Sequence, residues 1–244
     1  MEKAYKLLSH QQRISHREAK ILIDRGMVSV GGMKVKIARG LFPLGTKFSI
    51  QEAPKPKILM QDENLLAIDK PPFIASEELL KEHKEKGWTL LHRLDKETSG
   101  VILLVQEGSE FQKSAKAEFK AQKVYKEYVA IVEGMIPEER EITKPILTTK
   151  GHFAKSKISK EGESAYTKIE PLAYEGKQTQ LKVIIKTGRT HQIRVHLASI
   201  NHPIIGDTLY GGKNAKRILL HARKIALLGY EIESALPREF SLLK

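Results

Sequence analysis

The alternation of apolar and polar residues divides the chain into many short strands and a few helices. The apolar run Val101–Val105, bounded by turn residues, predicts a buried strand. Alternation and strand-favouring residues predict another over Lys123–Val132, with Tyr128 on the same face as Ala130 and Val132. Further strands are expected at Ile58–Met60, Leu65–Asp69, Ala165–Ile169, Leu181–Ile185 and Leu219–Ala222.

Helical patterns are fewer in this part of the chain. Glu110–Ala121 has helical spacing, and the charged residues 77 to 87 are also expected to be helical. A third helix follows Thr190, a good N-cap. Its apolar face carries Ile193, Leu197 and Ile200. Residues 134 to 162 are weakly patterned and are expected to be irregular loops. Many strands with few long helices favour an α+β fold with a mostly antiparallel sheet.

A proline-spaced segment divides the chain into two expected domains. Residues 53–57 read Ala-Pro-Lys-Pro-Lys, which is typical of a stiff, extended linker. The chain of 244 residues is long enough for one large domain, or for one medium domain and a small one. We therefore expect a small domain over residues 1–52 and a larger one over residues 58–244.

The small domain has its own pattern of elements. Ser15 can cap a helix with Glu18 as the second half of a capping box, and Gly26 can end that helix. A hairpin with a Gly-Gly turn and a last strand follow. Their strands are expected at Val28–Val30, Lys34–Lys36 and Lys47–Ile50.

Composition adds a strong positive charge to this picture. There are 42 Lys and Arg residues against 29 Asp and Glu residues, a formal net charge of +13. Such an excess favours a polyanionic partner, and nucleic acid before a membrane surface. There are no cysteines, which excludes disulfides and thiolate metal sites. No long apolar stretch or signal-peptide core is present, so a cytoplasmic location without membrane attachment is expected.

Basic residues are concentrated in the small domain. Arg17, Lys20 and Arg25 lie on its helix, away from the apolar face. The segment from Ile14 to Ile50 resembles an S4 RNA-binding domain in its helix, its Val-Ser-Val-Gly-Gly hairpin and its Leu-Gly-Thr turn. The resemblance implies RNA binding by the helix and the hairpin. A solvated charged face is the alternative interpretation.

One carboxylate stands out in the large domain. Asp95 lies between Arg93 and Lys96, just before the apolar run at Val101. Alone, this stretch favours a surface ion pair over a functional site. However, Arg194 neighbours the apolar face of the third helix, and a partly buried arginine needs an acid partner, for which Asp95 is the candidate. The helix start beside Arg189 is a possible phosphate site.

Four stretches of the large domain resemble the pseudouridine synthases of the RluA family. They are Asp69–Pro71, His92–Asp95 with Thr98–Gly100, Lys126–Ala130, and Gly188–His196 with His202-Pro203 and Gly206-Asp207. The resemblance covers residues 58 to 232, and members often carry an S4 domain. The segment 73 to 87 is shorter than in most members, which leaves the RNA-facing surface of that region open. The resemblance implies a pseudouridine synthase fold with a mixed, mostly antiparallel sheet.

The resemblance also implies roles for individual residues. Asp95 would be the nucleophile, Tyr128 would stack on the target uracil, and Arg194 would pair with Asp95. Arg93 would help to hold the RNA, and Leu220 would form the apolar wall under the base. Further candidate RNA contacts are Lys70, Arg189 and His191. The isomerisation involves no redox change, so no cofactor or metal is expected. The sequence leaves open whether Asp95 attacks C6, attacks C1′ or abstracts the 2′ hydrogen.

Alternatives remain at this stage. The expected activity is isomerisation of uridine by a monomer, in large-subunit ribosomal RNA before transfer RNA. The alternative is a non-catalytic S4-domain RNA-binding or ribosome-assembly protein. A methyltransferase is disfavoured because no Gly-rich nucleotide loop follows an early strand. Zinc is disfavoured because His191 and His196 are five residues apart and lie on different helix faces.

Overall fold

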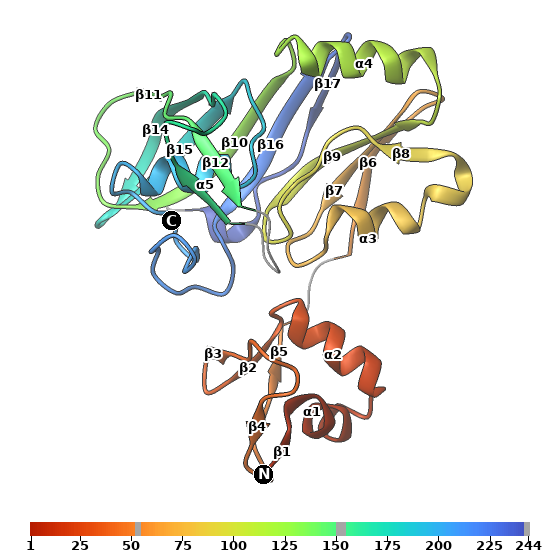
Figure 1. Ribbon diagram of the computed structural model, residues 1–244, viewed down its shortest axis with the longest axis vertical. Coiled ribbons are helices and arrows are strands. Elements are labelled where there is room, and N and C mark those ends of the chain that lie inside the picture. The colour runs from red at the N-terminus through yellow and green to blue at the C-terminus, as the bar shows by residue number, and fades with distance from the viewer. Residues whose placement is uncertain (52–54, 150–154, 242–244) are drawn as a thin grey trace. The chain divides into compact units, whose positions relative to one another are not determined.

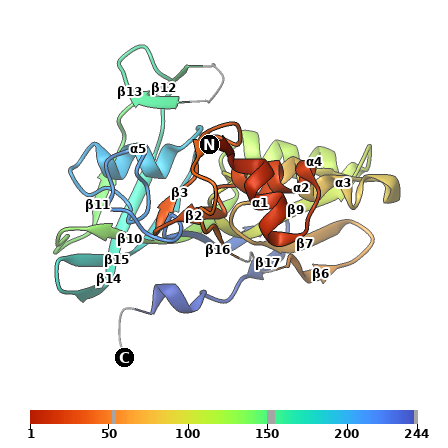
Figure 2. The same cartoon turned by 90° about the horizontal axis from the view of Figure 1, so that it is seen from below.

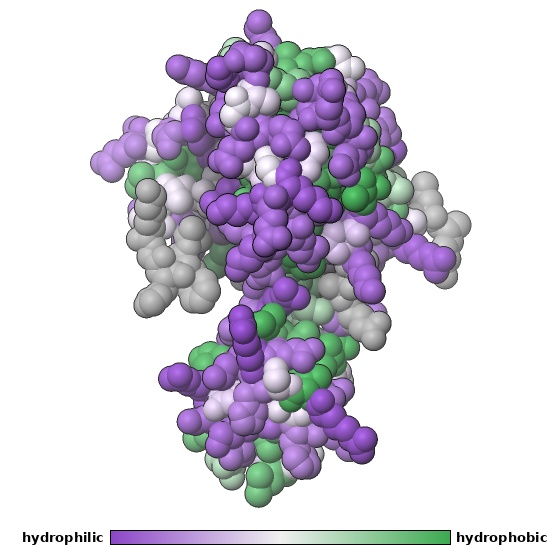
Figure 3. All heavy atoms as spheres, turned by 90° about the vertical axis from the view of Figure 1, so that its right-hand side faces the viewer, coloured by the Kyte–Doolittle hydropathy of each residue, from purple (hydrophilic) through white to green (hydrophobic). Residues whose placement is uncertain are grey.

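The computed structural model describes residues 1–51, 55–149 and 155–241. The chain divides into two compact units, Met1–Lys55 and Pro56–Lys244, so the division falls inside the expected linker. In the view of Figure 3, each unit presents mainly hydrophilic side chains with smaller apolar patches. No helix within the described ranges is long and apolar enough to cross a lipid bilayer.

The first unit contains two helices and short strands around a small apolar core. Helices α1 (Ala4–Gln12) and α2 (His16–Asp24) pack beside strands β2 (Val28–Val30), β3 (Met33–Lys34) and β5 (Ser49–Ile50). Strands β1 (Glu2–Lys3) and β4 (Leu41–Phe42) form a separate pair. The core includes Leu8, Ile23, Val28 and Phe48.

The predicted helix of the first unit is confirmed. The Ser15 hydroxyl accepts a hydrogen bond from the backbone N–H of Glu18 at 3.1 Å, and Gly26 follows the helix with a φ of 69°. The hairpin is also present, with a second strand shorter than expected. The sequence did not predict α1 or the β1–β4 pair, because these elements gain their order from packing on α2 and on the loop before β4.

The second unit is built on a mixed ten-stranded sheet (Figure 1). The strand order along its main path is β11-β14-β15-β10-β16-β9-β7-β6, with β17 paired to β16 and β8 paired to β9. In this sheet β9 and β16 are parallel, whereas the other described pairings are antiparallel. The strands are β6 (Lys57–Gln61), β7 (Leu65–Lys70), β8 (Trp88–Leu90), β9 (Ser99–Gln106), β10 (Tyr125–Glu133), β11 (Arg140–Ile142), β14 (Thr167–Glu175), β15 (Gln178–Ile185), β16 (Leu220–Leu227) and β17 (Tyr230–Glu233). The expected α+β fold with a mixed, mostly antiparallel sheet is therefore confirmed.

The two faces of the sheet carry separate apolar cores, because successive side chains of a strand point to opposite faces. On β9, Ile102 and Leu104 pack with α3 (Ser76–Lys81) and α5 (Gln192–Ala198), whereas Leu103 packs on the opposite face with α4 (Glu110–Lys120). The candidate site lies on the α5 face. The expected helix over residues 77 to 87 is α3 followed by the 3-10 turn η1 (Lys84–Lys86).

Two expectations about secondary structure are wrong. Residues 134 to 162 are not simply irregular, because they include β11 and an antiparallel pair made of β12 (Ile146–Thr149) and β13 (Lys155–Ile158). Figure 2 shows β12 and β13 set apart from the main sheet. Few apolar residues mark these strands, since they bury little surface. Residues 150–154, within the same segment, lie outside the described residues.

The second error concerns the start of α5. Thr190 does not cap the helix, which begins at Gln192 after His191 in the left-handed region with a φ of 54°. The N-terminus of α5 has no side-chain cap, and the Gln192 side chain instead holds the turn before the helix. Its amide oxygen accepts from the backbone N–H of Arg189 at 3.0 Å and from the Thr187 hydroxyl at 2.7 Å. A capping rule that considers Thr190 alone does not account for these contacts of Gln192.

Candidate active site

Asp95 lies in the loop that joins β8 to β9, and buried contacts hold this loop from behind. The Ser76 hydroxyl donates to the carbonyl of Leu94 at 3.0 Å and accepts from the Leu94 backbone N–H at 3.1 Å. On the other side of Asp95, the carbonyl of Lys96 accepts from the Lys70 ammonium at 3.2 Å. The backbone is therefore fixed on both sides of the carboxylate.

Lys70 does not contact RNA as the sequence predicted. Its side chain is fully buried, and its ammonium donates to the carbonyls of Pro71 at 3.0 Å, Ile74 at 2.9 Å and Lys96. Burial lowers its pKa to about 7, although the charge of Asp95 acts in the opposite direction. Lys70 is thus a positioning residue that ties two loops together behind Asp95.

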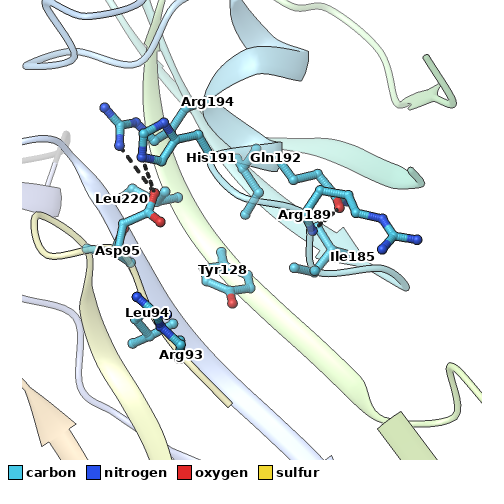
Figure 4. Close-up of a pocket in the computed structure, with 13 residues that line it drawn as sticks. Arg93, Leu94, Asp95, Tyr128, Ile185, Arg189, His191, Gln192, Arg194 and Leu220 are labelled. Carbon is cyan, nitrogen blue, oxygen red and sulfur yellow. Dashed lines mark hydrogen bonds and ion pairs between the residues drawn. The ribbon is translucent and has the colours of Figure 1, made fainter. Parts of the chain in front are cut away.

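Arg194 connects Asp95 to a second carboxylate. Its Nε and Nη2 donate to the two oxygens of Asp207 at 2.7 and 2.9 Å, and its Nη1 donates to Oδ2 of Asp95 at 3.2 Å (Figure 4). Burial opposes the charge on Arg194, yet Asp207 and Asp95 outweigh it and raise the pKa of the guanidinium above its ordinary value. The structure therefore brings together the expected Asp95–Arg194 pair.

Asp207 is a site residue that sequence reasoning did not assign. The sequence predicted that Arg194 needs an acid partner, and only Asp95 was considered for it. The structure pairs Arg194 with both Asp95 and Asp207, although the Gly206-Asp207 motif was visible in the sequence. Asp207 is 1% exposed and forms the two-pronged half of the contact. This fork holds the guanidinium plane, so that Nη1 faces Asp95.

His191 faces Asp95 from the start of α5. Its Nε2 lies 4.0 Å from Oδ2 of Asp95, and its Nδ1 lies 2.8 Å from the Tyr210 hydroxyl. That hydroxyl accepts from the backbone N–H of Ser156 at 3.0 Å, so its own hydrogen can be donated to Nδ1. Burial lowers the pKa of His191, which favours a neutral ring with its hydrogen on Nε2, toward Asp95.

Tyr128 and Leu220 line the same pocket as Asp95, with a volume of about 70 Å³. They come from neighbouring strands, since β10 pairs with β16 and places Ala130 opposite Leu220. Burial, with a smaller contribution from Asp95, raises the pKa of the Tyr128 phenol. Tyr128 is therefore a neutral phenol near pH 7, suited to packing against a flat ring.

Arg93 and Arg189 lie at the rim of the pocket. The Arg93 side chain is 73% exposed and pairs with Glu77 at 2.9 Å. The Arg189 guanidinium pairs with Glu163, donates to the Ser164 carbonyl at 3.1 Å and points away from Asp95 in Figure 4. Exposed ion pairs contribute little energy, so another anion can replace either carboxylate at small cost.

The three basic candidates on α2 belong to the first unit. Arg17 is exposed, Arg25 is half-buried at the helix end, and the Lys20 ammonium lies 4.4 Å from the centre of the Tyr5 ring. Their expected contact with RNA stays a prediction. Among the described residues, no three His, Cys, Asp or Glu side chains are grouped so that they could hold a metal ion.

Comparisons with known proteins agree with this geometry. A family model described as RNA pseudouridylate synthase matches residues 57–199. An uncharacterized RNA pseudouridine synthase of Helicobacter pylori strain J99 is 62% identical over 244 residues, covering 99% of this chain and 100% of the relative. The dual-specificity RNA pseudouridine synthase RluA of Vibrio cholerae is 32% identical over 197 residues, covering 74% of this chain and 80% of the relative.

A solved structure is similar as well. Human RNA pseudouridylate synthase domain containing 1 superimposes with a TM-score of 0.64 at 26% identity, covering 75% of this chain and 83% of that one. The family match begins at residue 57, so the S4 resemblance of the first unit stays a prediction.

Proposed function

The chain belongs to the RNA pseudouridylate synthase family and is an RNA pseudouridine synthase, an isomerase; on this premise, we propose that Asp95 is its nucleophile. The contact between Asp95 and Arg194 carries this proposal. Asp95 is 24% exposed on the pocket side, whereas Arg194 behind it is 4% exposed. A positioned, ionised carboxylate at the wall of a pocket is what covalent catalysis requires.

The reaction moves one bond within the nucleotide. The bond between N1 and C1′ breaks, the uracil turns, C5 joins C1′, the hydrogen on C5 leaves as a proton, and N1 takes up a proton. Asp95 can add to C6, attack C1′ or abstract the 2′ hydrogen, and all three routes begin with the same ionised carboxylate. Both described polar contacts of this carboxylate use Oδ2, and in Figure 4 the other oxygen points toward the side of Tyr128.

The remaining pocket residues receive the base. A uridine in a stacked helix cannot reach Asp95, so the target must be flipped out of its stack. Tyr128 offers an aromatic face, and a stacked base is worth about 1–3 kcal/mol on such a surface. Leu220 lies on the wall beside it. The raised pKa of Tyr128 supports a role in stacking before one as a free base for the C5 proton.

The substrate is proposed to be ribosomal RNA, most favourably of the large subunit, with transfer RNA as the second choice. The first unit supports an RNA of this size, because its basic helix α2 resembles that of an S4 domain and carries Arg17 and Lys20, with Arg25 directly after it. The cytoplasm, where this RNA is assembled, is the proposed location, and a monomer is the proposed form. Deleting residues 1–55 should weaken RNA affinity while the second unit stays folded; unchanged affinity would count against this assignment.

The activity is tested by tritium release. Ribosomal RNA transcribed with uridine tritiated at C5 is incubated with the full chain, without any added cofactor. The proposal predicts that tritium appears in water as pseudouridine forms. Release from transfer RNA alone would move the substrate to that class. No release from either RNA would overturn both proposed substrates.

A further inference from the structure

A second cavity of about 620 Å³ opens beside the catalytic pocket. The two share a wall of Arg93, Tyr128, Ile185, Gly188 and Arg189. The volume falls in the range of sites that hold small organic groups, about 300–1,000 Å³. The reaction described above uses none of the residues specific to this second cavity.

The lining of the second cavity is basic. Its cationic side chains are Arg93, Lys120, Lys126, Lys186 and Arg189. No Asp or Glu is among the described residues that line it. Arg93 and Arg189 are paired with Glu77 and Glu163, but among the described residues no carboxylate is paired with Lys120, Lys126 or Lys186. These three charges concentrate positive potential in the cavity, which attracts an anion.

Lys126 is the most unusual of these bases. It is 8% exposed on β10, and its ammonium donates to the carbonyl of Lys186 at 2.9 Å. No carboxylate lies within ion-pair distance of it among the described residues. Burial alone lowers its pKa to about 8. A buried cation of this kind is stabilised when an anion enters the cavity.

The other wall offers a flat aromatic surface. The Phe119 ring stacks on His92 with centroids 5.7 Å apart and planes 23° apart, and the Lys126 ammonium lies 5.5 Å from the centre of the Phe119 ring. His92 accepts a hydrogen bond from the backbone N–H of Leu103 through Nε2 at 3.1 Å, which fixes its ring. Leu91 extends this surface. An aromatic surface beside a cationic side chain suits a nucleobase joined to its phosphate.

We propose that this cavity binds a nucleotide next to the target uridine, with a phosphate against Lys126 and a base against Phe119. The proposal rests on the RNA pseudouridine synthase function. An RNA strand that places a uridine at Asp95 must continue past the wall that the pocket and the second cavity share. The cavity is thus a subsite for a neighbouring nucleotide, and it contributes to the choice of substrate.

Binding of single-stranded RNA tests the subsite directly. The full chain is titrated with a fluorescent decamer of uridine, and anisotropy is followed at several salt concentrations. Lys126→Met should weaken binding about tenfold and reduce the slope of log affinity against log salt by about 0.7, the value for one lost phosphate contact. Phe119→Leu should weaken binding about fivefold or more with the slope unchanged.

Lys123→Met is the matched control, because Lys123 precedes the same strand, is exposed and does not line the cavity. Its affinity and slope should equal those of the unchanged chain. Equal affinity and slope in Lys126→Met would overturn the subsite, even if tritium release shows that the enzyme is active. Binding needs no turnover, so failure of the proposed activity is a separate result.

Crosslinking gives a second measurement that needs no variant. A decamer containing 4-thiouridine is irradiated with the full chain, and the attached peptide is identified by mass spectrometry. The subsite predicts attachment within residues 119–126. Attachment confined to residues outside the second cavity would contradict it.

Discussion

The catalytic pocket and the second cavity share a wall but differ in whether their buried cation is paired with a carboxylate. In the pocket, Arg194 is forked to Asp207 and reaches Asp95, so each buried charge has a partner. In the cavity, Lys126 is nearly as buried, but its ammonium has a carbonyl and an aromatic ring instead of a carboxylate. The paired charges fix a geometry, whereas the unpaired one is left for an anion that arrives with the substrate.

This difference follows from what each site must do. A nucleophile needs one orientation in every turnover, and a two-pronged arginine contact supplies it. An RNA backbone must be bound and released, so its phosphate cannot compete with a built-in carboxylate. Removing one partner should therefore be costly in the pocket and mild in the cavity.

The largest effect is expected for Arg194→Met. It leaves Asp207 buried without its cation, which typically destabilises a protein by about 3–5 kcal/mol. Urea unfolding should show this loss, and tritium release should fall by more than a thousandfold. The double variant Arg194→Met with Asp207→Leu should recover stability without activity. A stable and active Arg194→Met chain would break the comparison.

A smaller effect is expected on the pH dependence of stability, through His92 in the wall of the second cavity. Burial, helped by the charge of Lys126, lowers the pKa of His92 to about 4, below the ordinary value of 6.5. The unfolded chain thus takes up a proton between pH 6.5 and 4 that the folded chain does not, and stability is lost as pH falls through this window. The contribution is about 1.4 kcal/mol for each pH unit.

His92→Gln keeps an acceptor for the Leu103 N–H but does not titrate. Urea unfolding at pH 7, 6 and 5 should show a shallower loss of stability for this variant than for the unchanged chain. His221, also buried with a pKa lowered to about 3 by burial, contributes equally to both chains and cancels in the difference. Parallel curves would show that His92 is not held neutral.

The smallest effect is the pH dependence of RNA binding. Lys126 is charged below a pKa of about 8 and neutral above it, so affinity for the uridine decamer should fall severalfold between pH 7 and 9.5. The other titratable or charged groups that line the cavity are His92, Arg93, Lys120, Tyr128, Lys186 and Arg189. Lys126→Met should show a flatter profile over the same range. Identical profiles for the two chains would show that the charge of Lys126 does not contribute to RNA binding.

Much of the fold follows from local patterns. Apolar periodicity predicted β9, β10 and α4 because each buries a continuous face, and the Ser15 cap is a local contact within one helical turn. The β12–β13 pair was missed because it has little apolar surface. The Thr190 cap was wrong because the helix begins only at Gln192, whose side chain holds the preceding turn.

The site divides in a similar way. Asp95 and Arg194 could be paired in advance, because a buried arginine requires an acid and the resemblance supplied one. The roles of Asp207 and Lys126 could not be assigned from the sequence, because each role depends on which charges lie beside the side chain after folding. Lys70 was misassigned for the same reason, because its burial beneath three carbonyls is a property of the assembled loops.

The most direct measurement uses Asp95→Asn in a single-turnover assay with tritiated ribosomal RNA. The substitution keeps the size of the side chain and its contact with Arg194 but removes the carboxylate. We predict no tritium release within the time in which the unchanged chain completes its reaction, with RNA affinity within about twofold. Release at a rate close to that of the unchanged chain would contradict the assignment of Asp95 as the nucleophile.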